Sequence, residues 1–355
     1  MHLYNKLNKE QLIARLQSET FTRRTVSFYR YFKIDNPEEF RNNLYLHLDA
    51  LHCLGRIYVA KEGINAQLSL PVHLEDVFVN TVNGIKGLSN VPMKWAVEDQ
   101  SDSFLKLIIK VRDKVVADGL NDSSFDPGDV GKHLTAKQFN ELMDDDNTVV
   151  VDMRNHYESE IGKFENAFCP DADTFRDAIK IVTEKYEDKK DKRFLLYCTG
   201  GIRCEKASAY LRHLGYKDVN QLHGGIIDYA RQIKEEELQS KYVGKNFVFD
   251  NRLGESIDGQ VISKCHQCGA PCDTHTNCAN DDCHLLFIQC PKCAEKYEGC
   301  CSSDCKTINQ LPYKIKKEFR VLRHQKYAES KIFKSRLRPN LMKMQNNNHY
   351  QDSSC

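Results

Sequence analysis

Apolar and β-branched positions in the first third of the chain form short strand-like runs, separated by two segments of helical period. Residues 25–32 are β-branched and aromatic, which predicts a strand. Residues 37–51 begin with a proline and carry apolar side chains at helical spacing, which predicts a helix. The elements predicted after these are strands at 55–60 and 64–68, a helix at 71–82, and strands at 94–97 and 105–111.

The predicted order over residues 1–112, β-α-β-β-α-β, is typical of a ferredoxin-like (acylphosphatase-like) α+β domain. Its two helices should cover one face of an antiparallel sheet and leave the other face for a partner. This fold serves many functions, so it assigns none by itself. Residues 113–134 contain glycine, proline, asparagine and serine at positions that break every periodicity, and we expect a linker there.

The sequence from Cys198 to Arg203, Cys-Thr-Gly-Gly-Ile-Arg, lies between an apolar run that predicts a buried strand and a predicted helix over 204–214. Such a turn directs backbone N–H groups and a helix dipole toward the sulfur, and Arg203 adds a positive charge. These effects favour the thiolate, which is the nucleophilic form of cysteine. Gly200 and Gly201 permit the positive φ angles that an anion cradle needs. The alternative is a buried structural cysteine beside a tight turn.

The pattern Cys-x-x-Gly-x-Arg after a strand resembles the active-site loop of rhodanese domains. The resemblance extends upstream to a predicted strand that ends in Asp152-Met-Arg154, and downstream to Leu222-His-Gly-Gly-Ile. It implies an α/β domain with a central parallel sheet over residues 135–243. It also implies that Cys198 carries the chemistry, with a supporting set made of Asp152 and Arg154 and of the loop residues Thr199, Gly200, Gly201 and Ile202.

A chain of 355 residues is long enough for two or three domains. No run of about 18 consecutive apolar residues predicts a membrane helix, and the first residues lack the apolar core of a secretory signal. The 15 cysteines fall largely in Cys-x-x-Cys-like spacings, which in a cytosolic chain indicate metal ligation rather than disulfides. We therefore expect a cytoplasmic protein.

Charge is unevenly distributed along a chain whose net charge is only +1. Between Lys306 and Lys343, twelve lysines and arginines accompany two acidic residues. We expect a basic, partly disordered tail over residues 314–355. Such a tail is the footprint of a polyanionic partner, although a merely solvated tail is the alternative.

Residues 244–313 are expected to form a small Cys-rich module. Cys265 with Cys268, and Cys290 with Cys293, have the Cys-x-x-Cys spacing that lets both sulfurs of a turn reach one tetrahedral zinc ion. An iron–sulfur cluster, or no metal at all, are the alternatives. A second ion could be held by some of the remaining cysteines, whose pairing the spacing leaves open: Cys272, Cys278, Cys283, Cys300, Cys301 and Cys305, with His275 and His284 nearby.

The order of these three modules, together with the run Arg56-Ile-Tyr-Val-Ala-Lys-Glu-Gly-Ile-Asn-Ala-Gln67, resembles the bacterial tRNA uridine hydroxylases, a family of rhodanese-containing proteins. The resemblance covers residues from about 26 to 313. It implies hydroxylation of the wobble uridine to 5-hydroxyuridine, with molecular oxygen as co-substrate and the tRNA anticodon stem-loop as partner. It also implies that Cys198 is the catalytic cysteine, as a nucleophile or a persulfide. The chain has no Rossmann glycine fingerprint, so no nucleotide cofactor is evident.

Contacts to the RNA have several candidates in the N-terminal domain. Lys61 and Asn65 lie near a predicted loop, where a charge and an amide could meet tRNA, although a solvated turn is the alternative. Tyr29, Tyr31 and Phe32 could form a platform on which an unstacked base lies. Strand aromatics, however, are also common core residues.

How the thiol at Cys198 would serve an oxygenation does not follow from the residues. One hypothesis is that its sulfur adds to C6 of the uracil and makes C5 electron-rich. Cys204 could resolve a disulfide with Cys198, but it is expected to pack as the first helical residue. Two other functions remain open: a sulfurtransferase acting on thiosulfate or a persulfide, and a non-catalytic RNA-binding scaffold. The flanking domains favour the hydroxylase, because a minimal sulfurtransferase needs neither of them.

Overall fold

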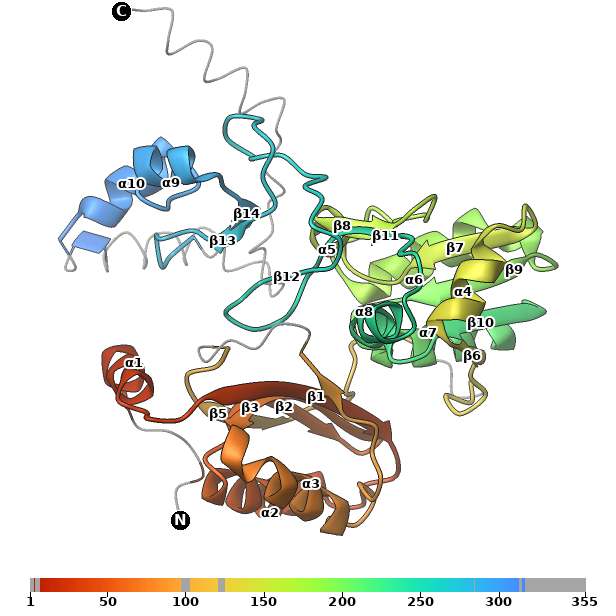
Figure 1. The fold of residues 1–355 in the computed structure, drawn as a ribbon, viewed down its shortest axis with the longest axis horizontal. Helices are drawn as coiled ribbons and strands as arrows, with labels where there is room; N and C mark the ends of the chain where they lie inside the picture. Colours follow the sequence, from red (N-terminus) through yellow and green to blue (C-terminus); the bar gives the residue numbers. More distant parts are fainter. Residues whose placement is uncertain are drawn as a thin grey trace, which may run out of the picture. The chain divides into compact units, whose positions relative to one another are not determined.

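The computed structural model describes residues 3, 7–96, 103–120, 125–283, 285–312 and 315–316. The chain divides into two compact units (Figure 1). The first unit comprises Met1–Ser159, Lys163–Tyr242 and Asn246–Ile257, and the second comprises Glu160–Gly162, Val243–Lys245 and Asp258–Cys355. The expected basic tail over 314–355, except for residues 315–316, lies outside the described residues, as does His284.

The first unit begins with the predicted ferredoxin-like domain, which the structure confirms. After helix α1 (Lys9–Gln17), its sheet has the strand order β4-β1-β3-β2-β5. Strand β5 pairs in parallel with β2, whereas β3 runs antiparallel to both β1 and β2. The elements of the domain are β1 (Arg23–Tyr31), α2 (Pro37–Ala50), β2 (Leu54–Ala60), β3 (Gly63–Pro71), α3 (Glu75–Gly84), β4 (Lys94–Trp95) and β5 (Leu107–Val111).

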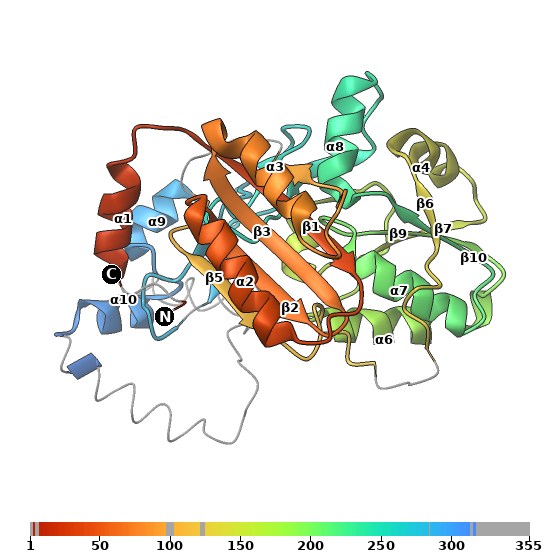
Figure 2. The same ribbon diagram turned by 90° about the horizontal axis from the view of Figure 1, so that it is seen from below.

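Side chains alternate between the two faces of this sheet, as the period of a strand requires. Val26 and Phe28 on β1 and Ala66 on β3 are buried in a core that α2 and α3 cover (Figure 2). Phe32 belongs to this side, where its ring packs 5.9 Å from Phe40. The expectation that Phe32 forms part of a stacking platform is therefore wrong.

The α/β domain with its parallel sheet follows in the chain, and the structure confirms it. Its strand order is β6-β10-β9-β7, with all pairs parallel. A further three-stranded sheet has the order β12-β11-β8. The elements are β6 (Lys132–Leu134), α4 (Ala136–Met143), β7 (Thr148–Asp152), α5 (His156–Ser159), β8 (Gly162–Phe164), α6 (Phe175–Lys185), β9 (Arg193–Tyr197), α7 (Ile202–His213), β10 (Asp218–Leu222), α8 (Gly225–Glu235), β11 (Tyr242–Asn246) and β12 (Glu255–Ser256).

Helix α7 joins the two domains of the first unit through buried polar contacts. The Tyr29 hydroxyl donates to Glu205 over 2.9 Å. Lys206, of which 3% is exposed, donates to Glu62 over 2.6 Å and to Asp118 over 3.0 Å. The Tyr29 contact places the first turn of α7 against the face of the ferredoxin-like sheet opposite α2 and α3, and Lys206 links the same turn to the β2–β3 turn and to the segment after β5.

The second unit is small and rich in cysteine. It contains an antiparallel pair of strands, β13 (His275–Asn277) and β14 (Leu286–Ile288), followed by α9 (Pro291–Tyr297) and α10 (Ser303–Gln310). Three buried cysteines and Phe287 form one small core cluster, against which two further cysteines pack. In the part of the chain that is described, no helix has the length and apolar character needed to cross a membrane.

Replacing Lys206 with alanine should destabilise the first unit. The Asp118 carboxylate would stay buried with only one of its two ammonium partners, Lys114, so we expect a loss of about 3 kcal/mol. Urea unfolding of the full chain measures it. The matched control is Lys217→Ala, which removes an exposed ion pair with Asp191 and should have little effect on the free energy of unfolding. Equal effects of the two substitutions would contradict the structural role of Lys206.

Candidate active site

Cys198 directly follows β9, and its side chain is fully buried. The Gly201 N–H donates to the Cys198 sulfur over 3.1 Å, which a positive φ of 97° at Gly201 makes possible. The Cys198 carbonyl accepts from the Ile226 N–H over 3.0 Å at the start of α8. A Cβ at Gly225 would lie 2.5 Å from that carbonyl oxygen, so the Gly-Gly turn after β10 is required for this closure.

The Cys198 thiol is acidic despite its burial. Burial alone would raise its pKa, but a hydrogen bond with the Cys204 thiol, the charge of Arg203 and the N–H groups of Cys204 and Gly201 together lower the pKa to about 6. Burial is the main cause that raises the pKa of Cys204 well above its usual value, and the hydrogen bond with Cys198 raises it further. At neutral pH the site therefore holds a thiolate on Cys198 and a protonated thiol on Cys204.

Arg203 is held in place by a buried carboxylate. Its guanidinium donates to both oxygens of Glu158 over 2.5 and 2.8 Å, and to the Thr199 hydroxyl over 3.3 Å. Burial would raise the pKa of Glu158, but the charges of Arg203 and Arg154 lower it. The charge of Arg203 thus stabilises the Cys198 thiolate, while its hydrogen bond to Thr199 helps to hold the loop.

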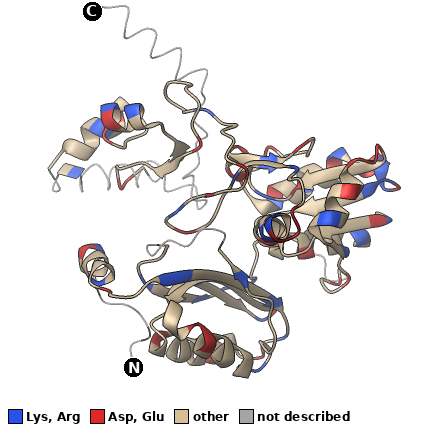
Figure 3. Ribbon diagram, viewed as in Figure 1, with Lys and Arg blue, Asp and Glu red and all other residues tan. Residues whose placement is uncertain are grey.

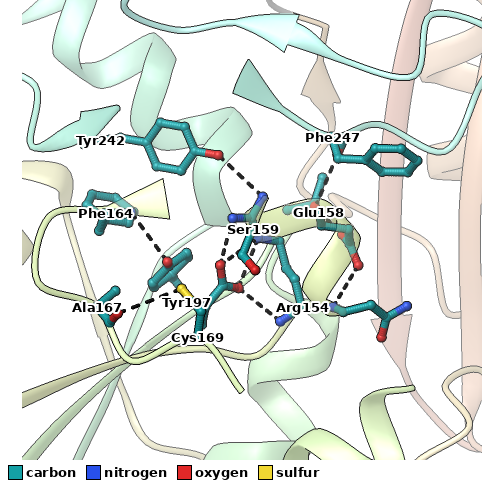
Figure 4. A network of polar contacts seen from close by, with 12 residues as sticks. Arg154, Glu158, Ser159, Phe164, Ala167, Cys169, Tyr197, Tyr242 and Phe247 are labelled. Atoms are coloured by element: carbon teal, nitrogen blue, oxygen red, sulfur yellow. Dashed lines mark hydrogen bonds and ion pairs between the residues drawn. The ribbon is translucent and has the colours of Figure 1, made fainter. Parts of the chain in front are cut away.

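Asp152 and Arg154 form a second buried ion pair. Figure 4 shows the network of polar contacts around Arg154. The guanidinium donates to both carboxylate oxygens, at 2.7 Å for the shortest contact, and reaches the Tyr242 hydroxyl at 3.3 Å. Neither residue has a hydrogen bond to Cys198 among the described contacts. Asp152 ends β7, and its pairing with Arg154 fixes the start of the segment that follows this strand. That the two residues support the reactive loop stays a prediction.

Lys94 on β4 is a component of the site that the sequence did not point to. Its ammonium lies 4.2 Å from the centre of the Tyr29 ring. Burial lowers the pKa of Lys94 to about 8, although negative charge on Cys198, Asp228 and Glu205 acts to raise it. The ferredoxin-like domain therefore brings a cation that is near its titration point to the thiolate.

Tyr29 closes the loop from the same side as Lys94. A Cβ at Gly201 would lie 2.8 Å from the Tyr29 hydroxyl oxygen, so the tyrosine leaves no room there for a side chain. The Tyr31 hydroxyl contacts the Ile202 carbonyl at 3.4 Å. Tyr29 and Tyr31 are partly buried against the loop, and their use as a stacking platform for a base stays a prediction.

Three further residues were singled out from the sequence: Gly200, Asn65 and Lys61. Gly200 is partly exposed in the loop, and a Cβ there would meet nothing within 4 Å. Asn65 faces the same side of the sheet as Tyr29, because the two residues are paired across β1 and β3. Lys61 is exposed in the turn between β2 and β3, and no described contact brings its side chain to the loop.

Two groups of four cysteines could each hold a metal ion in the second unit. All ligand atoms within a group lie within 4.8 Å of one another. The first group contains Cys265, Cys268, Cys290 and Cys293, as the spacing indicated. The second group, which the spacing left open, contains Cys278, Cys283, Cys301 and Cys305, while Cys272 and Cys300 belong to neither. Four thiolates suit a tetrahedral ion such as zinc and leave no open position for catalysis.

Fold and site together define a rhodanese-type protein with an acylphosphatase-like domain in front of its reactive loop. Three family models match the chain in succession. These are the UPF0176 acylphosphatase like domain over residues 23–115, the Rhodanese-like domain over 135–232 and the Rhodanase C-terminal over 243–306.

Curated relatives extend over nearly the whole chain. The tRNA uridine(34) hydroxylase of Leptospira interrogans is 54% identical over 96% of this chain and 93% of its own length. That of Photorhabdus laumondii is 51% identical over 95% of each chain. Among solved structures, a rhodanese-like domain protein from Staphylococcus aureus is 23% identical over 28% of this chain and 90% of its own, with a TM-score of 0.23. The chain belongs to the tRNA uridine(34) hydroxylase family.

The thiolate state of Cys198 can be titrated directly. We expect the thiolate absorbance that distinguishes the wild type from Cys198→Ser to rise with a midpoint near pH 6, because the pKa is lowered to about 6. Cys204→Ala should move the midpoint upward by removing a hydrogen-bond donor, whereas Cys169→Ala should leave it in place. A wild-type midpoint near 8.5, the usual value for cysteine, would contradict the geometry.

Metal content tests the two cysteine groups. We expect two zinc ions for each chain, one for each group of four sulfurs. Cys265→Ser should lower the zinc content by one ion, measured by elemental analysis of the purified protein. The matched control is Cys272→Ser, which lies outside both groups and should retain both ions. Loss of an ion in the control, or iron in place of zinc, would show the assignment to be wrong.

Proposed function

We propose that this protein hydroxylates the wobble uridine of tRNA in the cytoplasm, using molecular oxygen and yielding 5-hydroxyuridine. The observation that carries the proposal is the Cys198 thiolate, with a pKa of about 6, in a loop that Tyr29 and Lys94 of a second domain close. Support also comes from the curated relatives, which carry the name tRNA uridine(34) hydroxylase.

Cys198 acts as a nucleophile in this proposal. Addition of its sulfur to C6 of the uracil moves the electron pair of the C5–C6 double bond onto C5, which then takes an oxygen atom. Loss of the C5 proton afterwards expels the sulfur from C6, restoring the ring double bond and the thiolate. A low thiol pKa assists both steps, because the thiolate is abundant at neutral pH and leaves readily.

Dioxygen supplies two oxygen atoms, of which the uracil keeps one. The other leaves as water, which requires two electrons and two protons from a two-electron reductant such as a dithiol. Lys94, whose pKa is lowered to about 8, is mostly protonated at neutral pH and can give a proton near C5. Its charge, with that of Arg203, also stabilises the anion on sulfur and the negative charge that develops on the uracil.

We assign zinc a structural role and no catalytic one. The two cysteine groups would each close a four-thiolate site and fix a segment whose core is small. RNA binding would involve the ferredoxin-like domain, in which Asn65 and the exposed Lys61 remain candidate contacts. The anticodon stem-loop is the proposed substrate element, because single-stranded bases can leave the stack and reach a buried sulfur.

Mass spectrometry of tRNA nucleosides tests the function. A strain without the gene should lose 5-hydroxyuridine and its derivatives, and a wild-type copy should restore them. Cys198→Ser should restore none, because the hydroxyl is a far weaker nucleophile than the thiolate. Cys53→Ser, which changes a buried cysteine of the ferredoxin-like core, should restore the nucleosides and serves as the matched control.

The sulfurtransferase is the competing function, since the Cys198 loop also suits a persulfide. If purified protein transfers sulfur from thiosulfate while the deletion leaves 5-hydroxyuridine unchanged in a strain with no parallel pathway, the hydroxylase proposal fails. Incubation of purified protein with tRNA under isotopically heavy oxygen gas tests the oxygen source. The heavy isotope should appear in the modified nucleoside, and its absence there would rule out dioxygen as the donor.

A further inference from the structure

The face of the ferredoxin-like sheet opposite α2 and α3 carries an unusual set of side chains. None of the five strands contains an aspartate or glutamate, whereas they contain arginines and lysines at several positions. Figure 3 shows basic positions on the strands of this domain and no acidic position on them. A polar sheet face without carboxylates is suited to a polyanion.

Strand register places these side chains in two rows across the face. The first row runs from Tyr29 on β1 through Asn65 on β3 and Tyr58 on β2 to Lys110 on β5. Because adjacent strands are about 4.8 Å apart, this row spans about 14 Å. The second row lies beside the first and contains Lys94, Ser27, Gln67, Arg56 and Ile108.

Each row contains partly buried residues at the Cys198 loop and an exposed cation on β2 or β5. Tyr29 and Lys94 are partly buried at the loop, whereas Arg56 and Lys110 are exposed near the edge strand β5. Tyr58 lies between them, partly exposed, with the guanidinium of Arg112 5.8 Å from its ring centre. The rows thus lead from the reactive sulfur to open, positively charged surface.

We propose that this face, defined by Tyr58, Asn65, Gln67, Arg56 and Lys110, binds single-stranded nucleotides of the tRNA loop that carries the target uridine. Tyr58 supplies a ring for one base, Asn65 and Gln67 supply amides for base edges, and Arg56 and Lys110 contact phosphates. The inference rests on the proposed function and adds to it the surface that positions the loop. The occupant is RNA and not an acidic peptide, because a tyrosine ring and two amide side chains, which suit the faces and edges of bases, lie beside the cations.

Two matched pairs of variants test the surface by binding of a labelled anticodon stem-loop RNA to the full chain. Tyr58→Ala should weaken affinity about five- to a hundredfold, the range for loss of one stacked base, whereas Tyr58→Phe keeps the ring and should bind like the wild type. Arg56→Glu should weaken binding and lower the slope of log affinity against log salt by about 0.7 for the lost phosphate contact. Lys86→Glu, at an exposed position after α3, makes the same charge change away from the face and should have little effect.

The inference is overturned if Arg56→Glu binds the stem-loop as Lys86→Glu does, or if Tyr58→Ala binds as Tyr58→Phe does. It is also overturned if the variants weaken binding of the stem duplex without its loop to the same extent, since the surface would then recognise duplex phosphates. Arg56 is exposed, so its variant remains informative should Tyr58→Ala fail to fold. If the wild type modifies tRNA and the face variants bind the RNA normally, this surface alone is disproved. If the wild type has no hydroxylase activity, the proposed function is disproved.

Discussion

A buried thiolate is the constraint on which the rest of this structure depends. Removing a charged sulfur from water is unfavourable, so the fold must surround Cys198 with hydrogen-bond donors and positive charge. Backbone amides of the loop, the Cys204 thiol and Arg203 do so. Arg203 would itself be an unpaired buried charge without Glu158, whose two carboxylate oxygens accept hydrogen bonds from its guanidinium.

The ferredoxin-like domain completes this environment instead of merely flanking it. Tyr29 occupies the space above Gly201, and Lys94 brings a cation to the sulfur. Its contact with α7 uses groups that are costly to bury singly and are therefore paired, with Lys206 between Glu62 and Asp118. Pairing of this kind fixes the orientation of the two domains, which a purely apolar contact would leave less specific.

Sequence patterns predicted the fold better than the site. Strand alternation and helical period gave the order of the ferredoxin-like elements, because these periods report local burial. The Cys198 loop was recognisable because all its parts are contiguous. Lys94 and Glu205 were missed because their partners are distant along the chain, with a separation of 176 positions between Tyr29 and Glu205. A charged residue with a distant partner is indistinguishable in sequence from one in solvent.

The central claim, that the Cys198 sulfur meets the target uracil, is tested most directly with tRNA that carries 5-fluorouridine at the wobble position. Fluorine cannot leave C5 as a proton does, so an adduct at C6 should persist. Mass spectrometry of the digested complex should find the nucleotide on the peptide that contains Cys198 in the wild type, and no adduct in Cys198→Ser. An adduct that forms equally in Cys198→Ser, or that maps to another cysteine, would contradict the account.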